Sequence, residues 1–171
     1  MTDGLDRSVA EAFYDALASR SAELIAPFLD EDVDWLMVGP VELFAFCGQH
    51  YGRATVLEAY RRLSENEVAR NNVREFLLVD DDCAAALTRI TNIETRTGHE
   101  INFRVAHFAR FRDSKVIEYC GIPDSLGKAE QTLGRQLDMT LAPLSGVPTP
   151  PGFSARSRPA RDDRGCRAGC R

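Results

Sequence analysis

The sequence has no uninterrupted run of about 18 apolar residues, the length that a membrane-spanning helix needs. Its first residues, MTDGLDRS, lack the basic start and the apolar core of a secretory signal peptide. Both absences predict a cytoplasmic protein that has no membrane partner.

Positive charge is scarce outside the end of the chain. Residues 148–171 contain six Arg and two Asp, a net charge of +4 within a whole-chain net charge of −5, so residues 1–147 carry −9. Because nucleic-acid recognition depends on a basic face, we expect no nucleic-acid partner. With four Pro, three Gly and one large apolar residue, residues 148–171 are too polar to pack. The chain length predicts one domain, residues 1–147, followed by a disordered basic tail.

The five cysteines lack the spacing of a metal site. Cys47, Cys83 and Cys120 lie far apart in apolar surroundings, which predicts buried reduced thiols. Cys166 and Cys170 are four residues apart with no His nearby, which is half a zinc site at best. We therefore expect no bound metal.

Apolar residues at helical spacing predict three helices in the first half of the chain, within LDRSVAEAFYDALAS (5–19), SAELIAPFL (21–29) and RATVLEAYRRLSE (53–65). Pro27 should bend or end the second of them. A strand is expected at 33–38, and the apolar loop 41–46 should cover a pocket.

The second half of the chain reads as strands: NVREFLLVD, CAAALTRITNIET, EINFRVAHFARF and KVIEYCGI. Short segments of turn composition separate them, which indicates an antiparallel meander. Three helices before a curved antiparallel sheet predict an α+β fold with the helices on one face.

One histidine interrupts an apolar strand face. In INFRVAHFARF, alternate residues place His107 on the same face as Ile101, Phe103 and Val105. A buried imidazole needs a partner, because an unsatisfied buried polar group costs about 1–3 kcal/mol. It is either a satisfied core histidine or a functional group in a pocket.

Hairpin counting suggests partners for this histidine. A two-residue turn at Thr97 and Gly98 sets Thr88 opposite His107, with Ile90 opposite Val105 and Asn92 opposite Phe103, so that all three share its face. In the next hairpin a two-residue loop puts Cys120 opposite His107, and a three-residue loop puts Tyr119 there. We favour Tyr119, because Ile117, Tyr119 and Gly121 then face inward.

The order of elements, with FYDAL, FLDEDVDWLMVGP, YGRATVLEAYRRL and HFARFRDSKVIEY, resembles the nuclear transport factor 2-like superfamily over residues 5 to 125, especially its SnoaL-like and ketosteroid-isomerase-like branch. The resemblance implies a cone: a strongly curved antiparallel sheet wrapped around three N-terminal helices and enclosing an apolar pocket. It also implies a homodimer formed through the outer sheet face.

The resemblance can be tested at the positions of the three catalytic residues of the ketosteroid isomerases. Their tyrosine, aspartate base and protonated aspartate would fall at Phe13, Leu36 and His107. None of these positions keeps its residue, and leucine cannot abstract a proton. Steroid isomerisation by that mechanism is therefore not supported.

His107 still has chemical capacity near neutral pH, as acid, base or hydrogen-bond donor. The residues expected around the ligand are Tyr14, Trp35, Leu36, Tyr60, Thr88, Asn92, Phe103, Val105, Tyr119 and Asp124. Packing is the alternative for the aromatic residues among them. Asp124 could instead cap a helix formed by SLGKAEQTLG.

Two functions fit these expectations. The first is a pocket that binds an apolar, oxygen-bearing small molecule, with His107 as the polar or catalytic group of a cofactor-free isomerase, dehydratase or cyclase. The alternative is a non-catalytic ligand-binding or dimerisation module with Leu87 and Phe108 opposite each other on the outer face. An open cavity of several hundred Å3 would favour the first, and one holding a few waters would favour the second.

Overall fold

The computed structural model describes residues 4–138, and its elements belong to a compact unit that ends at Leu137. The helices are α1 (Arg7–Ala18), α2 (Ala22–Ile25), α3 (Arg53–Asn66) and α4 (Ser125–Leu133), with a 3-10 turn, η1 (Ala26–Phe28). The strands are β1 (Leu29–Met37), β2 (Gly48–Tyr51), β3 (Glu67–Asp80), β4 (Cys83–Glu94), β5 (Glu100–Arg112) and β6 (Lys115–Pro123). The predicted tail, with Cys166 and Cys170, lies outside the described residues.

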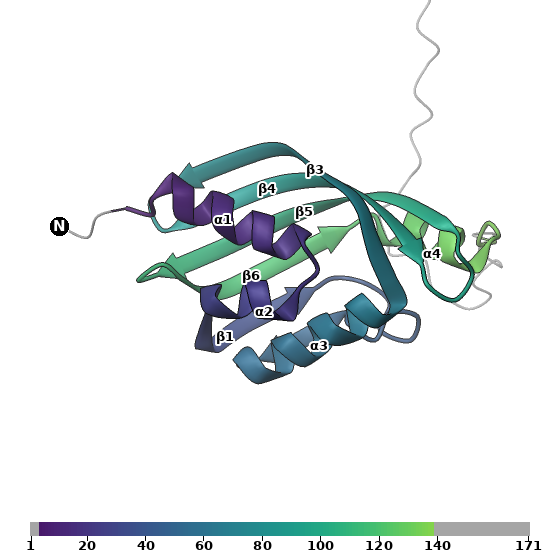
Figure 1. The fold of residues 1–171 in the computed structure, drawn as a ribbon, viewed down its shortest axis with the longest axis horizontal. Helices are drawn as coiled ribbons and strands as arrows, with labels where there is room; N and C mark the ends of the chain where they lie inside the picture. The colour runs from purple at the N-terminus through teal and green to yellow at the C-terminus, as the bar shows by residue number, and fades with distance from the viewer. Residues whose placement is uncertain (1–3, 139–171) are drawn as a thin grey trace, which may run out of the picture. The chain divides into compact units, whose positions relative to one another are not determined.

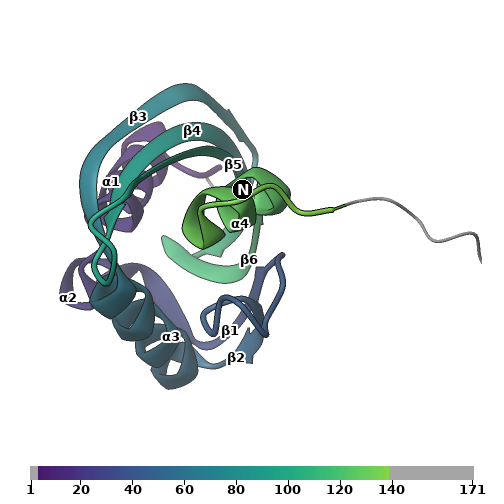
Figure 2. The ribbon, with the colours of Figure 1, turned by 90° about the vertical axis from the view of Figure 1, so that its right-hand side faces the viewer.

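The six strands form one curved, unclosed sheet in the order β2-β1-β6-β5-β4-β3, and α1 to α3 lie against its concave side (Figure 1). The α+β class is confirmed, but the sheet is mixed rather than antiparallel, because β1 runs parallel to β6. The sequence predicted no strand at the position of β2, which pairs with β1. Figure 2 shows α4 at the open end of the curved sheet.

An aromatic cluster joins α1 to the sheet. Phe13 is fully buried and lies edge-on to Phe111 and Tyr119, at ring-centre distances of 5.6 and 6.3 Å. Trp35 of β1 stacks on Tyr119 at 3.6 Å. Aromatic pairs of this kind add to the burial of apolar area. The cluster therefore fixes α1 and β1 on β6, beside the strand that carries His107.

The predicted register of the β4–β5 hairpin is wrong by two residues. Thr88 pairs with Val105, and Ala86 is the residue opposite His107. The reason is the loop: the Glu94 amide bonds to the His99 carbonyl, so four residues rather than two make the connection. A shift of two residues keeps every side chain on its face, so Thr88 remains on the side of His107.

The β5–β6 register differs from both alternatives. Asp113 and Ser114 form a two-residue turn with φ values of 50° and 60°, as in a type I′ hairpin. An irregularity between Arg110 and Phe111 then places one extra residue, Ile117, on β6, so that His107 lies opposite Gly121. Tyr119 faces inward as predicted, but Ile117 does not, and Val116 is buried in its place.

Among residues 4–138, no helix is long and apolar enough to cross a membrane.

Candidate functional site

A cavity of about 50 Å3 lies between the helices, the sheet, α4 and the predicted covering loop 41–46. Gly39 adds backbone to the lining, and half of the lining residues have apolar side chains: Leu17, Ala18, Met37, Phe44, Phe46, Leu63, Ile90, Phe103, Val105 and Pro123. The polar lining consists of Tyr14, Arg20, Cys47, Tyr60, Asn72, Thr88, His107, Ser125 and Lys128. Such a volume holds only a few waters.

His107 enters this cavity from β5 and is 5% exposed. Its Nδ1 lies 2.7 Å from the Tyr119 hydroxyl. Gly121 makes this contact possible, because a Cβ at that position would lie 2.9 Å from the Tyr119 hydroxyl oxygen. Burial, and next the positive charge of Arg20, lowers the pKa of His107 to about 3. The imidazole is therefore neutral at pH 7.

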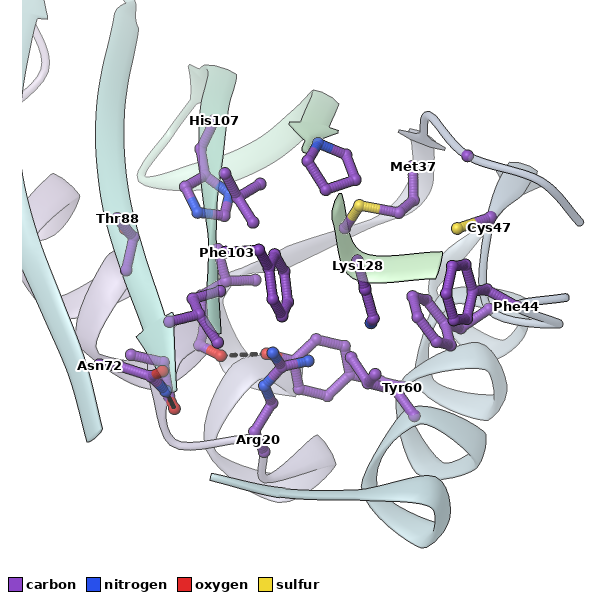
Figure 3. Close-up of a pocket in the computed structure, with 18 of the residues that line it drawn as sticks. Arg20, Met37, Phe44, Cys47, Tyr60, Asn72, Thr88, Phe103, His107 and Lys128 are labelled. Atoms are coloured by element: carbon purple, nitrogen blue, oxygen red, sulfur yellow. Dashed lines mark hydrogen bonds between the residues drawn. The ribbon is translucent and has the colours of Figure 1, made fainter. Parts of the chain in front are cut away.

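Hydrogen bonding determines which ring nitrogen carries the proton. The Tyr119 hydroxyl, whose pKa burial raises far above its usual value, makes no other hydrogen bond within the described part of the chain. If it did not donate to His107 Nδ1, its buried O–H would be unsatisfied. We therefore assign the proton of His107 to Nε2, which has no protein partner among residues 4–138 and faces the cavity (Figure 3).

Six of the predicted site residues line the cavity together: Tyr14, Tyr60, Thr88, Phe103, Val105 and His107. Two of their hydroxyls are already occupied, since Tyr14 donates to the Ala84 carbonyl at 2.9 Å and Tyr60 donates to the Leu17 carbonyl. The Thr88 hydroxyl makes no hydrogen bond to residues 4–138. Thr88 and His107 are thus the predicted polar residues still able to bond a ligand.

The other predicted site residues do not line the cavity: Trp35, Leu36, Asn92, Tyr119 and Asp124. Trp35 packs on Tyr119, which reaches the site only through His107. Alternation along β1 turns Leu36 away and leaves Met37 in the lining. Asp124 caps α4 by accepting from the Gly127 amide at 3.0 Å, which confirms the capping alternative.

Sequence reasoning missed Lys128, a residue of α4 that is only 3% exposed. Its ammonium pairs with Glu67, which accepts a second hydrogen bond from Asn92 at 2.6 Å. Asn92 is therefore a buried structural residue rather than a ligand-binding one as predicted. Burial lowers the pKa of Lys128 and the Glu67 carboxylate opposes this shift.

Aromatic rings complete the surroundings of Lys128. Its Nζ lies 4.6, 4.5 and 4.8 Å from the ring centres of Phe44, Phe46 and Phe103. Each ring face attracts a cation. Because Phe44 and Phe46 belong to the covering loop, Lys128 joins that loop to α4 and β5 at this end of the cavity.

Arg20 is the second residue that the sequence did not reveal. It lies two residues beyond the end of α1 with a φ of 60°, a left-handed conformation that usually selects glycine at this position. Three side chains hold the turn: Tyr60 donates to the Leu17 carbonyl, Asn72 to the Ala18 carbonyl at 2.7 Å and Ser64 to the Arg20 carbonyl at 2.6 Å.

Weak signals for both residues exist in the sequence. The position two residues beyond the end of α1 commonly carries glycine, so an arginine at 20 suggests that its side chain has a role. In α4, Leu126 and Leu133 are 43% and 41% exposed while Lys128 is buried. Hydropathy alone would therefore turn the leucine side of α4, rather than the side of Lys128, toward the cavity.

The cavity has hydrogen-bond donors but no carboxylate among the described residues that line it. Nor do residues 4–138 contain a group of three or more His, Cys, Asp or Glu placed to hold a metal ion. The arrangement can therefore donate hydrogen bonds to an oxygen atom of a ligand, from His107 Nε2 and from Arg20.

Comparisons with known proteins agree with this fold. A protein from Rhodopseudomonas palustris, provisionally named an isomerase, is 29% identical, with a TM-score of 0.70 over 79% of this chain and 100% of its own. An NTF2-like protein from Burkholderia xenovorans LB400 is 17% identical, with a TM-score of 0.60 over 73% of this chain and 93% of its own. A protein from Kribbella flavida, provisionally named a ketosteroid isomerase, is 22% identical, with a TM-score of 0.51 over 70% and 77%.

No curated protein is similar enough to this chain to count as a match. Residues 10–119 match the family model described as a SnoaL-like domain, which is more than half of the chain. The chain therefore belongs to the SnoaL-like domain family, within the nuclear transport factor 2-like superfamily.

Proposed function

We propose that this protein binds a small, largely apolar molecule whose oxygen atom accepts a hydrogen bond from Nε2 of His107. The single observation that carries the proposal is a neutral, buried imidazole with Nδ1 occupied by Tyr119 and Nε2 directed into an apolar cavity. A donor in a low-dielectric site interacts strongly with an acceptor, and costs free energy when it has none.

The volume of the cavity limits the ligand. About 50 Å3 lies below the 300–1,000 Å3 that is usual for ligand sites, and by volume alone it favours a cavity filled by its own side chains. A ligand of more than a few non-hydrogen atoms would therefore require the covering loop 41–46 to move. Only one side of this loop packs on the cavity, since Phe44 is buried while Val41 is 49% exposed.

An isomerase is the second candidate, supported by the 29% identity to the provisionally named isomerase from Rhodopseudomonas palustris. In this role the neutral His107 would polarise a carbonyl and stabilise the enolate that forms when the neighbouring carbon loses a proton. The lining carries no carboxylate base, and Lys128 is an ammonium paired with Glu67, so in this role water or the substrate itself would have to accept the proton.

The binding proposal is tested by the 15N signals of the His107 ring while cyclohexanone, a small ketone, is added. We expect Nε2 to shift and Nδ1, bonded to Tyr119, to shift less. His107→Phe should abolish the binding and His107→Gln, which keeps a hydrogen-bonding group, should weaken it. Unchanged ring signals, together with no small molecule retained by the purified protein in native mass spectrometry, would contradict the proposal.

The isomerase candidate has its own assay. The small ketone 3-cyclohexen-1-one gains a conjugated double bond when it isomerises to 2-cyclohexen-1-one, and ultraviolet absorbance follows the change. We expect catalysis that His107→Phe removes. A rate equal to that without protein, in a sample that binds cyclohexanone, would leave the binding function and exclude this reaction.

We also propose a homodimer of two copies joined through the outer sheet face. Three exposed apolar side chains lie there, Phe76 and Leu78 on β3 and Phe108 on β5, the two strands that flank β4, at 52%, 55% and 48% exposure. Leu87 pairs with Ala106, so it does not lie opposite Phe108 as predicted. Contiguous apolar surface of this kind is typical of interfaces. Native mass spectrometry should show a dimer that Phe108→Lys dissociates, and a monomeric wild type would contradict it.

A further inference from the structure

The two cations that face the cavity are paired to very different extents. Lys128 has Glu67, Phe44, Phe46 and Phe103 around its ammonium. The guanidinium of Arg20 makes no hydrogen bond and no ion pair with any residue in 4–138, although it lines the same cavity. Figure 3 shows the side chains of Arg20, Lys128 and His107 directed toward one space from different elements.

An arginine without an ion pair is unusual in the part of the chain that the structure describes. The described residues include 13 arginines, and 11 of them form ion pairs with a carboxylate. The two exceptions are Arg20 and Arg135, and Arg135 is exposed to solvent. A guanidinium beside an apolar cavity loses part of its hydration, which favours a partner of opposite charge.

Stabilisation of the end of α1 does not account for Arg20. A cation near a helix C-terminus is favourable because the last carbonyls carry partial negative charge. Here side chains of Tyr60 and Asn72 already satisfy the carbonyls of Leu17 and Ala18. The guanidinium is thus directed to the cavity and not to the helix end.

We propose that the ligand carries a carboxylate, which Arg20 binds while the apolar part of the ligand lies toward Phe103 and Val105. This deepens the proposed function and rests on it. A planar guanidinium offers two parallel N–H donors that match the two oxygens of a carboxylate. Lys128 is not the anchor, because Glu67 already neutralises it. Arg20 also contributes to the lowered pKa of His107, so its charge acts across the cavity.

The test compares carboxylates with neutral molecules of the same shape. Acetate, butyrate and benzoate are each titrated against the full chain by calorimetry, beside acetamide, butyramide and benzamide. We expect each carboxylate that fits to bind at least 10-fold more tightly than its amide. The series also tests whether the covering loop 41–46 opens, since benzoate exceeds the closed cavity.

Arg20→Gly is the decisive variant, because glycine suits the left-handed backbone at that position and the turn should fold as before. We expect it to lose at least 10-fold in affinity for the carboxylates and nothing for the amides. Arg20→Lys should lie between, since it keeps the charge but not the two-point geometry. Arg135→Gly, which removes the other unpaired arginine, is the matched control and should bind like the wild type.

The outcomes separate the two proposals. Equal binding of carboxylates and amides, or carboxylate binding that survives Arg20→Gly, overturns the carboxylate assignment and leaves the small-molecule-binding function standing. If neither series binds and the cyclohexanone experiment is also negative, both proposals fail.

Discussion

Lys128 and Arg20 face one cavity from two ends of the chain, and the fold treats them differently. Lys128 is almost fully buried, paired with Glu67 and surrounded by three aromatic rings. Arg20 is half-buried and its guanidinium has no partner among residues 4–138. A fully buried charge must be paired with an opposite charge of the protein to offset its lost hydration. A partly hydrated charge can stay unpaired until a ligand binds.

The difference separates a structural cation from one that is available for binding. Lys128 connects α4, through Glu67, to the start of β3, and so holds the open end of the sheet. Arg20 is held through its backbone by Ser64, and its guanidinium makes no hydrogen bond or ion pair with residues 4–138. Changes at the Lys128 end should therefore alter stability, and changes at the Arg20 end should alter binding.

The largest effect is expected from Lys128→Met. The change leaves the Glu67 carboxylate buried without its cation, and breaking a buried pair in this way costs about 3–5 kcal/mol. Urea denaturation followed by circular dichroism measures the free energy of unfolding. The double variant Lys128→Met with Glu67→Gln is the control, since it removes both charges and should recover most of the loss. A single variant within 1 kcal/mol of the wild type, roughly the range of an exposed pair, would contradict the structural role.

The next effect is a loss of stability in mild acid, which His107 should cause. Its folded-state pKa of about 3 lies below the value of about 6.5 in an unfolded chain. The unfolded state therefore binds the extra proton as the pH falls through 6.5, and stability decreases toward pH 3. Linkage gives a loss of about 2 kcal/mol between pH 7 and pH 5.

The same pH interval isolates this histidine from the carboxylates. Glu75 and Glu94 have pKa values lowered by their hydrogen bonds to Arg104 and Thr97, so they lose stabilising charge only below about pH 4.5. His107→Gln cannot take up the proton and should show a flat profile from pH 7 to pH 5. An equally steep profile in that variant would assign the loss to other groups.

A smaller effect should follow Tyr60→Phe, which acts on the Arg20 end through the backbone. Its hydroxyl donates to the Leu17 carbonyl in the buried turn. Without it this carbonyl keeps only the long 3.5 Å hydrogen bond from the Arg20 amide, and the loss should cost about 1–2 kcal/mol. Thermal unfolding measures the loss. Tyr51→Phe is the control, since that tyrosine is 68% exposed and its hydroxyl makes no hydrogen bond to the described residues. Equal stability of the two variants would remove Tyr60 from the support of the turn.

The smallest change in stability is expected from Arg20→Gly. Glycine relieves a left-handed backbone that costs about 1–2 kcal/mol for other residues, but it also gains entropy in the unfolded chain. The free energy of unfolding should stay within about 1 kcal/mol of the wild type. A loss as large as that of Lys128→Met would make Arg20 a structural cation too, and would end the contrast between the two ends.

Periodicity was enough to predict most of the fold. Apolar spacing in 5–19 and 53–65 correctly predicted α1 and α3, and alternation from Ile101 placed His107 on a buried face. The parallel pairing of β1 with β6 was not predicted, because strands distant in the chain leave no local pattern of their partner. The short strand β2 was missed for the same reason.

Register shows where counting along the chain stops working. The longer loop around Gly98 and the extra residue Ile117 changed which residues lie opposite His107, relative to the prediction. Two parts of the predicted surroundings of His107 were still correct. The β4–β5 register shifted by two residues, which keeps Thr88 on the face of His107. Tyr119, although not directly opposite, reaches Nδ1 of His107 diagonally past Gly121.

The sequence alone determined the α+β class, the family and the inward direction of His107, because side-chain periodicity and turn composition are local properties of the chain. Only the tertiary structure decided that Lys128 is buried with Glu67 and that Arg20 faces the cavity without a partner among residues 4–138. Both residues are charged, and sequence reasoning expects a charged side chain to be exposed to solvent. Whether it lies instead in a cavity depends on how α4 and the end of α1 pack on the sheet.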